Sequence, residues 1–172
     1  DWNPDHFLDV SEMAVALSLP LDWLDASLSK STKDAIHKAL VEKAFKPSIA
    51  VRGSNWWWNS EHNWNLVCHG GLAVAAIALY EKEPELASHI LDRTYKKFPL
   101  GFKPYYPDGA YFEGPSYWFY ATNYFALSLS AFESTLGTDF DFINAEGIKK
   151  SAVFTEVTAG PSGDYYNFFD AS

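Results

Sequence analysis

Three side chains that could bind or polarise a ligand lie at the start of the most apolar segment of the chain. Asn65 and His69 are four residues apart, so they share one face if this segment is a helix. Asn63 falls near the expected N-terminus of that helix, where free N–H groups favour an anion. Gly70 and Gly71 follow, and because glycine costs about 1 kcal/mol relative to alanine inside a helix, the pair indicates close approach by another helix or a ligand.

The same residues also fit a purely structural interpretation. Asn63 would then cap the helix, and His69 would be buried with its hydrogen bonds satisfied. The spacing alone is equally compatible with both hypotheses.

A second stretch leads from a turn rich in proline and glycine into a long helix. Tyr117, Tyr120 and Tyr124 are spaced i, i+3, i+7 and form one stripe of phenols, which is typical of a core stripe as well as of a catalytic face. Glu113 precedes them and suits a helix N-terminus. Asp108 and Glu113 could also form a carboxylate pair for glycoside hydrolysis, which requires a separation of about 5–10 Å.

The aromatic content is high, with seven Trp, ten Tyr and 13 Phe. Trp57, Trp58 and Trp118 lie close in sequence to Asn, His and Glu side chains, a combination that is typical of sugar sites, where rings stack on pyranoses and amides bind hydroxyls. We therefore expect these three Trp residues, with Asn65, His69, Glu113 and Tyr120, to contact a substrate.

Charge and motifs exclude several classes of protein. The formal net charge of −9 disfavours a nucleic-acid binder or a binder of anionic membranes. The longest apolar run, Leu72 to Tyr80, covers about half a bilayer, so no membrane insertion is expected. Cys68 is the only cysteine, and no zinc spacing, P-loop or dinucleotide fingerprint occurs, so we expect no metal and no cofactor.

Hydrophobic periodicity predicts an all-α domain of helical hairpins spanning residues 1–172. One or two helices are expected over residues 5–28, broken near Pro20, and another is expected to begin at Ser31 and end at Pro47. Further helices are expected over residues 64–80, from Pro84 onward, over 116–136 and over 144–158.

The two stretches together resemble the heparinase II/III-like polysaccharide lyases. The residues that carry the resemblance are Asn63 to Gly71, Asp108 to Trp118 and a third patch, Gly160 to Asp170. The resemblance implies that the helices form part of an incomplete (α/α) toroid, followed in the complete protein by C-terminal β-sandwich domains that this chain lacks. It further implies export to the periplasm or secretion, and an anionic polysaccharide as substrate.

The resemblance also implies a reaction, β-elimination in a uronic-acid polysaccharide of alginate or heparan type. Asn63 would neutralise the uronate carboxylate, and Tyr117 would move the protons. Because a phenol has a pKa of about 10 in model compounds, a nearby cation is needed, and Arg52 is the local candidate. Relatives place a His after the Asn, whereas here His62 precedes Asn63, and they supply a further catalytic His or Tyr from later in the chain.

Two other functions remain open from the sequence. The aromatic crowding suits a non-catalytic carbohydrate-binding α-domain equally well. A glycoside hydrolase with an α/α barrel would use Asp108 or Glu113.

Overall fold

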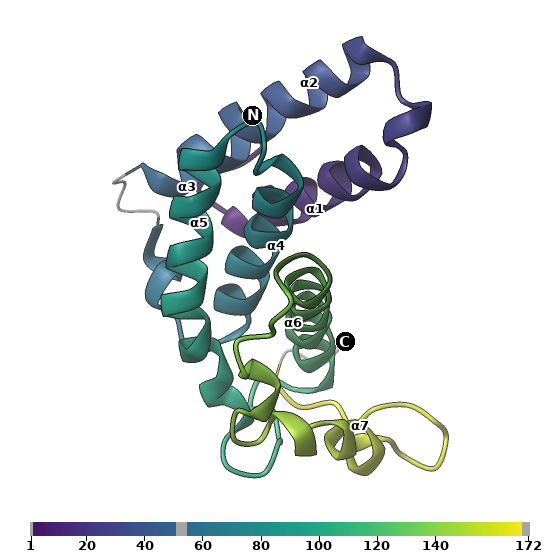
Figure 1. Ribbon diagram of the computed structural model, residues 1–172. Helices are drawn as coiled ribbons and strands as arrows, with labels where there is room; N and C mark the ends of the chain where they lie inside the picture. Colours follow the sequence, from purple (N-terminus) through teal and green to yellow (C-terminus); the bar gives the residue numbers. More distant parts are fainter. Residues whose placement is uncertain (1, 51–54, 170–172) are drawn as a thin grey trace.

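The computed structural model describes residues 2–50 and 55–169, and this part of the chain is all-α, as predicted (Figure 1). Within these residues the only strand-like pairing is an isolated bridge between Ala159 and Tyr165. The α-helices are α1 (Phe7–Trp23), α2 (Lys30–Leu40), α3 (Lys46–Ile49), α4 (Asn63–Leu79), α5 (Pro84–Lys97), α6 (Pro115–Leu136) and α7 (Ala152–Thr158).

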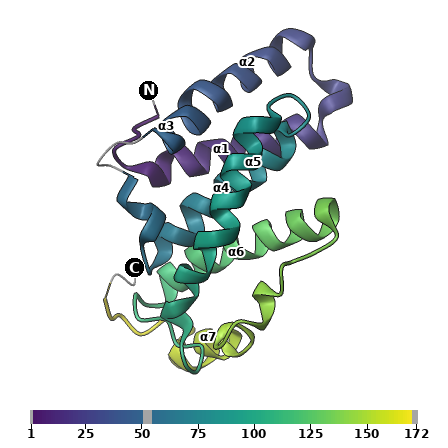
Figure 2. The same cartoon turned by 60° about the vertical axis from the view of Figure 1, so that its left-hand side comes forward.

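Helix α4 lies at the centre, between α1 and α6, and the three helices run in the same direction (Figure 2). At their starts, Phe7 packs against Trp57 just before α4, and Asn63 contacts Glu113 just before α6. At their ends the three helices border one groove of about 690 Å³, which Leu21, Leu79 and others line. The N-termini of α1, α4 and α6 therefore meet at one edge of the molecule, called here the N-terminal edge.

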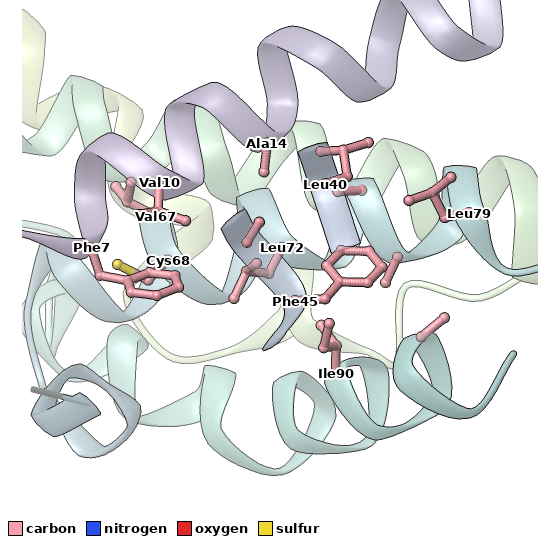
Figure 3. Close-up of a cluster of buried hydrophobic side chains, with 14 of the residues drawn as sticks. Phe7, Val10, Ala14, Leu40, Phe45, Val67, Cys68, Leu72, Leu79 and Ile90 are labelled. Carbon is pink, nitrogen blue, oxygen red and sulfur yellow. The ribbon is translucent and has the colours of Figure 1, made fainter. Parts of the chain in front are cut away.

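Helices α2 and α5 run in the opposite direction, back toward the N-terminal edge. Leu40 and Phe45 from the α2 segment and Ile90 from α5 pack with α1 and α4 in one buried cluster (Figure 3). A second buried cluster, on the other side of α4, joins Leu66 to Phe98 and Phe125 among others. Both faces of α4 are thus covered, which fixes the positions of the side chains at its start.

The adjacent glycines of α4 allow the flanking helices to approach closely. A Cβ atom at Gly71 would lie 2.1 Å from Ser11 Oγ and 2.9 Å from Ser11 O in α1. A Cβ atom at Gly70 would lie 2.6 Å from Ser128 Oγ in α6. The close approach that the sequence indicated is therefore made by other helices, and Ser11 Oγ uses it to donate a hydrogen bond to the Val67 carbonyl oxygen (2.6 Å).

Two proline predictions were wrong. Helix α1 continues through Pro20, which lies in its last turn, so the missing N–H removes one i→i−4 hydrogen bond without ending the helix. The α2 segment does not end at Pro47 but continues through a π-helical turn, Val41–Phe45, into α3. The wider turn changes the hydrogen-bond pattern just before the proline, which itself occupies the first turn of α3.

Two helix boundaries also differ from the prediction. Ser29, not Ser31, caps α2 by accepting a hydrogen bond from the Thr32 N–H (3.1 Å). The helix expected over residues 144–158 is broken into two short 3₁₀ turns, Phe142–Asn144 and Ile148–Lys150, and the short helix α7. Gly147 lies between these turns with φ of 82°, a conformation that interrupts a right-handed helix.

In the part of the chain that the structure describes, no helix has the length and apolar character needed to cross a bilayer.

We predict that Gly71→Ala destabilises the protein. The added methyl group would overlap Ser11 in α1, so the free energy of unfolding should fall by about 1–3 kcal/mol, even though alanine is the better helix former. Denaturant unfolding monitored by circular dichroism measures this change. Gly160→Ala is the control, because a Cβ there meets only Asp164 O at 3.3 Å, and equal stability of the two variants would contradict the prediction.

Candidate functional site

Asn63, the first residue of α4, binds the carboxylate of Glu113 at two points. Its backbone N–H donates to Glu113 Oε2 (3.0 Å), and its side-chain Nδ2 donates to Glu113 Oε1 (2.7 Å). Glu113 comes from the turn before α6, fifty residues later in the chain. A carboxylate thus occupies the N-terminus of α4, where free N–H groups favour negative charge.

This pair is largely enclosed. Asn63 is 2% exposed and the Glu113 side chain 14%. Asn63 Oδ1 is buried without a hydrogen-bond partner, and the nearest basic group to Glu113 is the His62 ring, whose Nδ1 lies 4.0 Å from Oε1. Asn63 is therefore a donor to carboxylates, and the carboxylate that it holds in this structure is internal.

Tyr117 lies on the first turn of α6, four residues after Glu113, and is half-buried. Its ring contacts that of Tyr120 at a centroid distance of 6.5 Å, and Tyr120 contacts Tyr124 at 5.5 Å. The predicted stripe of phenols is therefore present. Asn63 and Tyr117 lie at the same edge of the molecule, linked through Glu113 and the start of α6.

Tyr120 has a structural contact rather than a free hydroxyl. Its hydroxyl donates to a carboxylate oxygen of Glu12 in α1 and so ties α1 to α6 across α4. Burial, and next this acidic partner, raise the pKa of Tyr120. Tyr124, beside it, has its pKa raised by burial first and by Glu12 next. Both phenols hold their protons at ordinary pH.

The three consecutive tryptophans point in different directions. They belong to a 3₁₀ helix, Asn55–Asn59, in which successive side chains are about 120° apart. Trp57 is fully buried, Trp58 is half-buried, and Trp56 is 48% exposed. Only the first member of the run, Trp56, is well exposed.

Trp56 is part of an aromatic group on the surface at the N-terminal edge. Its ring lies 4.6 Å from that of Trp64 and 5.7 Å from that of His62, and Trp64 meets His6 of the α1 cap at 4.9 Å. These four residues, Trp56, His62, Trp64 and His6, are called here the aromatic platform. It lies next to Asn63, since His62 and Trp64 are its neighbours in the chain.

Three of the predicted substrate contacts are buried and cannot meet a polysaccharide at the surface, so for them the prediction was wrong. Trp57, Asn65 and His69 have no exposed surface, because the face of α4 that carries Asn65 and His69 packs against α5 and the 3₁₀ helix. Asn65 Nδ2 donates to the Lys97 carbonyl oxygen (3.2 Å), and the His69 ring bonds the Trp58 carbonyl oxygen through Nε2 (3.3 Å). The shared face was predicted correctly, but it is covered by protein.

Arg93 of α5 is the buried charge that the sequence analysis missed. Its guanidinium carbon lies 5.2 Å from the centre of the Trp57 ring and 4.9 Å from that of Trp58, so both indoles contact it. The available signal was its register, because Arg93 follows Leu86 and Ile90 on the apolar face of the predicted helix. A charge on such a face is a candidate for a buried role.

The remaining predicted residues contribute less. Trp118 is half-buried and packs against the second core cluster. Asp108 is exposed and accepts a hydrogen bond from the Ala110 N–H (3.1 Å), which stabilises its own turn. Arg52 lies outside the described residues. Among residues 2–50 and 55–169, no group of three or more His, Cys, Asp or Glu side chains is placed to hold a metal ion.

No protein-family model matches the chain, and no curated protein matches it at a significant level. The arrangement of side chains at the N-terminal edge therefore has to carry the functional argument.

We predict that Glu113→Ala destabilises the protein by about 1–3 kcal/mol, because it leaves two buried donors of Asn63 without an acceptor. Urea unfolding measures the change. Glu61→Ala is the matched control, since Glu61 forms an exposed ion pair with Lys103 (2.5 Å) whose loss should cost at most about 1 kcal/mol. Equal losses in the two variants would show that the Asn63–Glu113 contact is not special.

We also predict a pH dependence that comes from His69. Burial, and next the Arg93 charge, lower the pKa of His69 from 6.5 to about 3, so the unfolded chain binds more protons than the folded chain between these values. Stability should therefore fall as the pH drops below 6.5, by up to about 1.4 kcal/mol per pH unit from this group. Urea unfolding from pH 8 to pH 5 should show a shallower slope for His69→Asn, whereas His89→Asn, at an exposed position, should keep the wild-type slope.

Proposed function

We propose that this chain is the helical domain of a polysaccharide lyase, similar to the heparinase II/III-like enzymes, that cleaves a uronic-acid polysaccharide by β-elimination. The observation that carries the proposal is the two-point binding of a carboxylate by Asn63 at the N-terminus of α4, with the Tyr117 phenol on the adjacent first turn of α6. A uronate carboxylate offers the same two acceptor oxygens as Glu113. It would take the place of Glu113 on Asn63 when the substrate binds.

The chemistry follows from that placement. Two N–H donors on the uronate carboxylate stabilise the enolate-like intermediate that forms when the proton leaves C5. In the syn geometry, Tyr117 as phenolate takes the C5 proton, the C4–O4 bond breaks with its electron pair on O4, and Tyr117 returns a proton to that oxygen. The product then carries a double bond between C4 and C5.

The arrangement of helices supports the architecture that goes with this proposal. Helices α1, α4 and α6 run side by side in one direction, and α2 and α5, which pack against α1 and α4, run in the opposite direction (Figure 2). An (α/α) toroid repeats such pairs of inner and outer helices. We therefore propose that these helices form one arc of an incomplete toroid, which further domains of an exported protein would complete.

The charge of the chain favours a less acidic substrate. A net charge of −9 repels polyanions, and the repulsion grows with the number of charges on the polymer. An unsulfated uronan of alginate type carries one charge per sugar, whereas heparin, with its sulfate groups, carries more. We therefore propose the unsulfated polymer as the better substrate.

A non-catalytic carbohydrate-binding domain is the second candidate, and the aromatic platform favours it. Asn63 is 2% exposed, whereas Trp56 of the platform is 48% exposed. An exposed indole beside a second indole and two imidazoles is suited to stacking on a sugar ring. In this alternative the chain holds the polymer, and bond cleavage occurs elsewhere.

We predict that Tyr117→Phe abolishes lyase activity in the protein at the full length that its gene encodes. The phenol supplies the proton transfer, so the rate of formation of the unsaturated product, followed by its ultraviolet absorbance on alginate oligomers, should fall by about 100-fold or more. Tyr166→Phe is the control, because Tyr166 is exposed in the C-terminal segment. Unchanged turnover in Tyr117→Phe would reject the assignment.

The same product assay, combined with a binding measurement, distinguishes the carbohydrate-binding function from the lyase function. If the full-length protein binds oligouronides in a calorimeter but forms no unsaturated product, the carbohydrate-binding function is right. Trp56→Ala should then weaken binding, whereas Trp23→Ala should not, since Trp23 is even more exposed (73% against 48%) but lies at the C-terminal end of α1, away from the N-terminal edge.

A further inference from the structure

The interface between α4 and α5 contains a positive charge, Arg93 of α5, for which no acidic partner is present among residues 2–50 and 55–169. Arg93 is 7% exposed, and its Nη1 donates to the Ser48 carbonyl oxygen (2.7 Å). Its Nε and Nη2 atoms are buried and have no hydrogen-bond partner among the protein atoms. Buried guanidinium groups are ordinarily paired with a carboxylate, because removal of the charge from water is costly.

The geometry leaves one particular edge of the guanidinium unpaired. The Trp57 and Trp58 rings, at 5.2 and 4.9 Å, contact the group by cation–π interactions, and Ser48 binds Nη1. The Nε–Nη2 edge remains. That edge presents two parallel N–H donors, which is the arrangement that binds the two oxygens of a carboxylate or a similar oxyanion side-on.

The two tryptophans that contact Arg93 also carry unpaired donors. The indole Nε1–H groups of Trp57 and Trp58 are also buried without a protein acceptor, although each ring contacts Arg93. A buried donor without an acceptor is destabilising. The two unpaired donors on the free edge of Arg93 are the pair that an acceptor from outside the chain would satisfy.

The neighbouring titratable groups do not neutralise Arg93. Burial raises the pKa of the Cys68 thiol, which therefore stays neutral. The Trp58 carbonyl oxygen can only accept a hydrogen bond, so His69 Nε2 carries the proton, and Nδ1, which has no partner, is an acceptor. Lys97, the other charge that acts on His69, is also a cation, so the local charge is positive in a chain whose net charge is −9.

We propose that Arg93, Trp57 and Trp58 form a buried site for a small oxyanion of carboxylate type, which binds side-on to the Nε–Nη2 edge of Arg93. Of the two rings, Trp58 is half-buried and Trp57 is fully buried. The site would bind such an anion whether or not the chain cleaves polysaccharides. A free small acid and the carboxylate of a single uronic acid share this chemistry, and the size of the ligand distinguishes them.

The test is a titration of the wild-type protein with sodium acetate against sodium chloride at equal ionic strength and pH. Acetate should raise Tm saturably by about 3 °C or more, and chloride, which cannot bridge the two donors, should not. In a parallel NMR titration, acetate should shift the indole N–H resonances of Trp57 and Trp58. The second titration uses sodium glucuronate. If glucuronate also raises Tm and shifts the indole resonances, the site admits a sugar acid. If only acetate does so, the site is restricted to small anions.

Variants locate the effect. Arg93→Lys keeps the charge but lacks the paired N–H donors, so it should lose the acetate response, whereas Lys96→Met, at an exposed position on the same helix, should keep it. If Arg93→Lys does not fold, the titrations of the wild-type protein with acetate and chloride still test the proposal. Equal responses to acetate and chloride, or no shift of either indole resonance, would overturn the proposal and leave a buried water as the partner of Arg93.

Discussion

Helix α4 has almost no contact with solvent, and this burial constrains the elements around it. Of its residues, only Trp64, Ile77 and Ala78 are more than slightly exposed. The helix can therefore exist only where α1, α5 and α6 cover it, and its two adjacent glycines set how closely α1 and α6 approach. Because the contacts are this close, the start of α4 is held in a fixed relation to the starts of its neighbours. The meeting of Asn63 with Glu113 depends on that relation.

Much of the helical structure could be predicted from the sequence, since apolar spacing determines which segments are helices. Pro20 and Pro47 misled the prediction because both helices accommodate the missing N–H, Pro20 in the last turn of α1 and Pro47 in the first turn of α3 after a π-helical turn. The spacing also predicted correctly that Asn65 and His69 share a face. It could not reveal that α5 covers this face, because burial depends on tertiary contacts between segments that are distant in the sequence.

The three consecutive tryptophans also show that the sequence alone does not reveal which side chains are buried. A 3₁₀ helix turns each successive side chain by about 120°, so Trp56, Trp57 and Trp58 have three different environments. Composition indicates that aromatic rings gather there, but not which ring is exposed. Likewise, Arg93 was visible in the sequence only as a charge on an apolar face. Its contact with two indoles could be recognised only from the three-dimensional structure.

The parallel course of α1, α4 and α6 has a consequence for how a charged polymer meets this surface. Three aligned helices add their partial positive charges at one edge, while the chain as a whole is strongly acidic. At about 150 mM salt, Coulomb forces fade over about 8 Å, so a distant polyanion feels mainly the overall repulsion and a bound one mainly the local attraction. Added electrolyte would then speed the encounter by screening the first effect, while weakening the complex once formed.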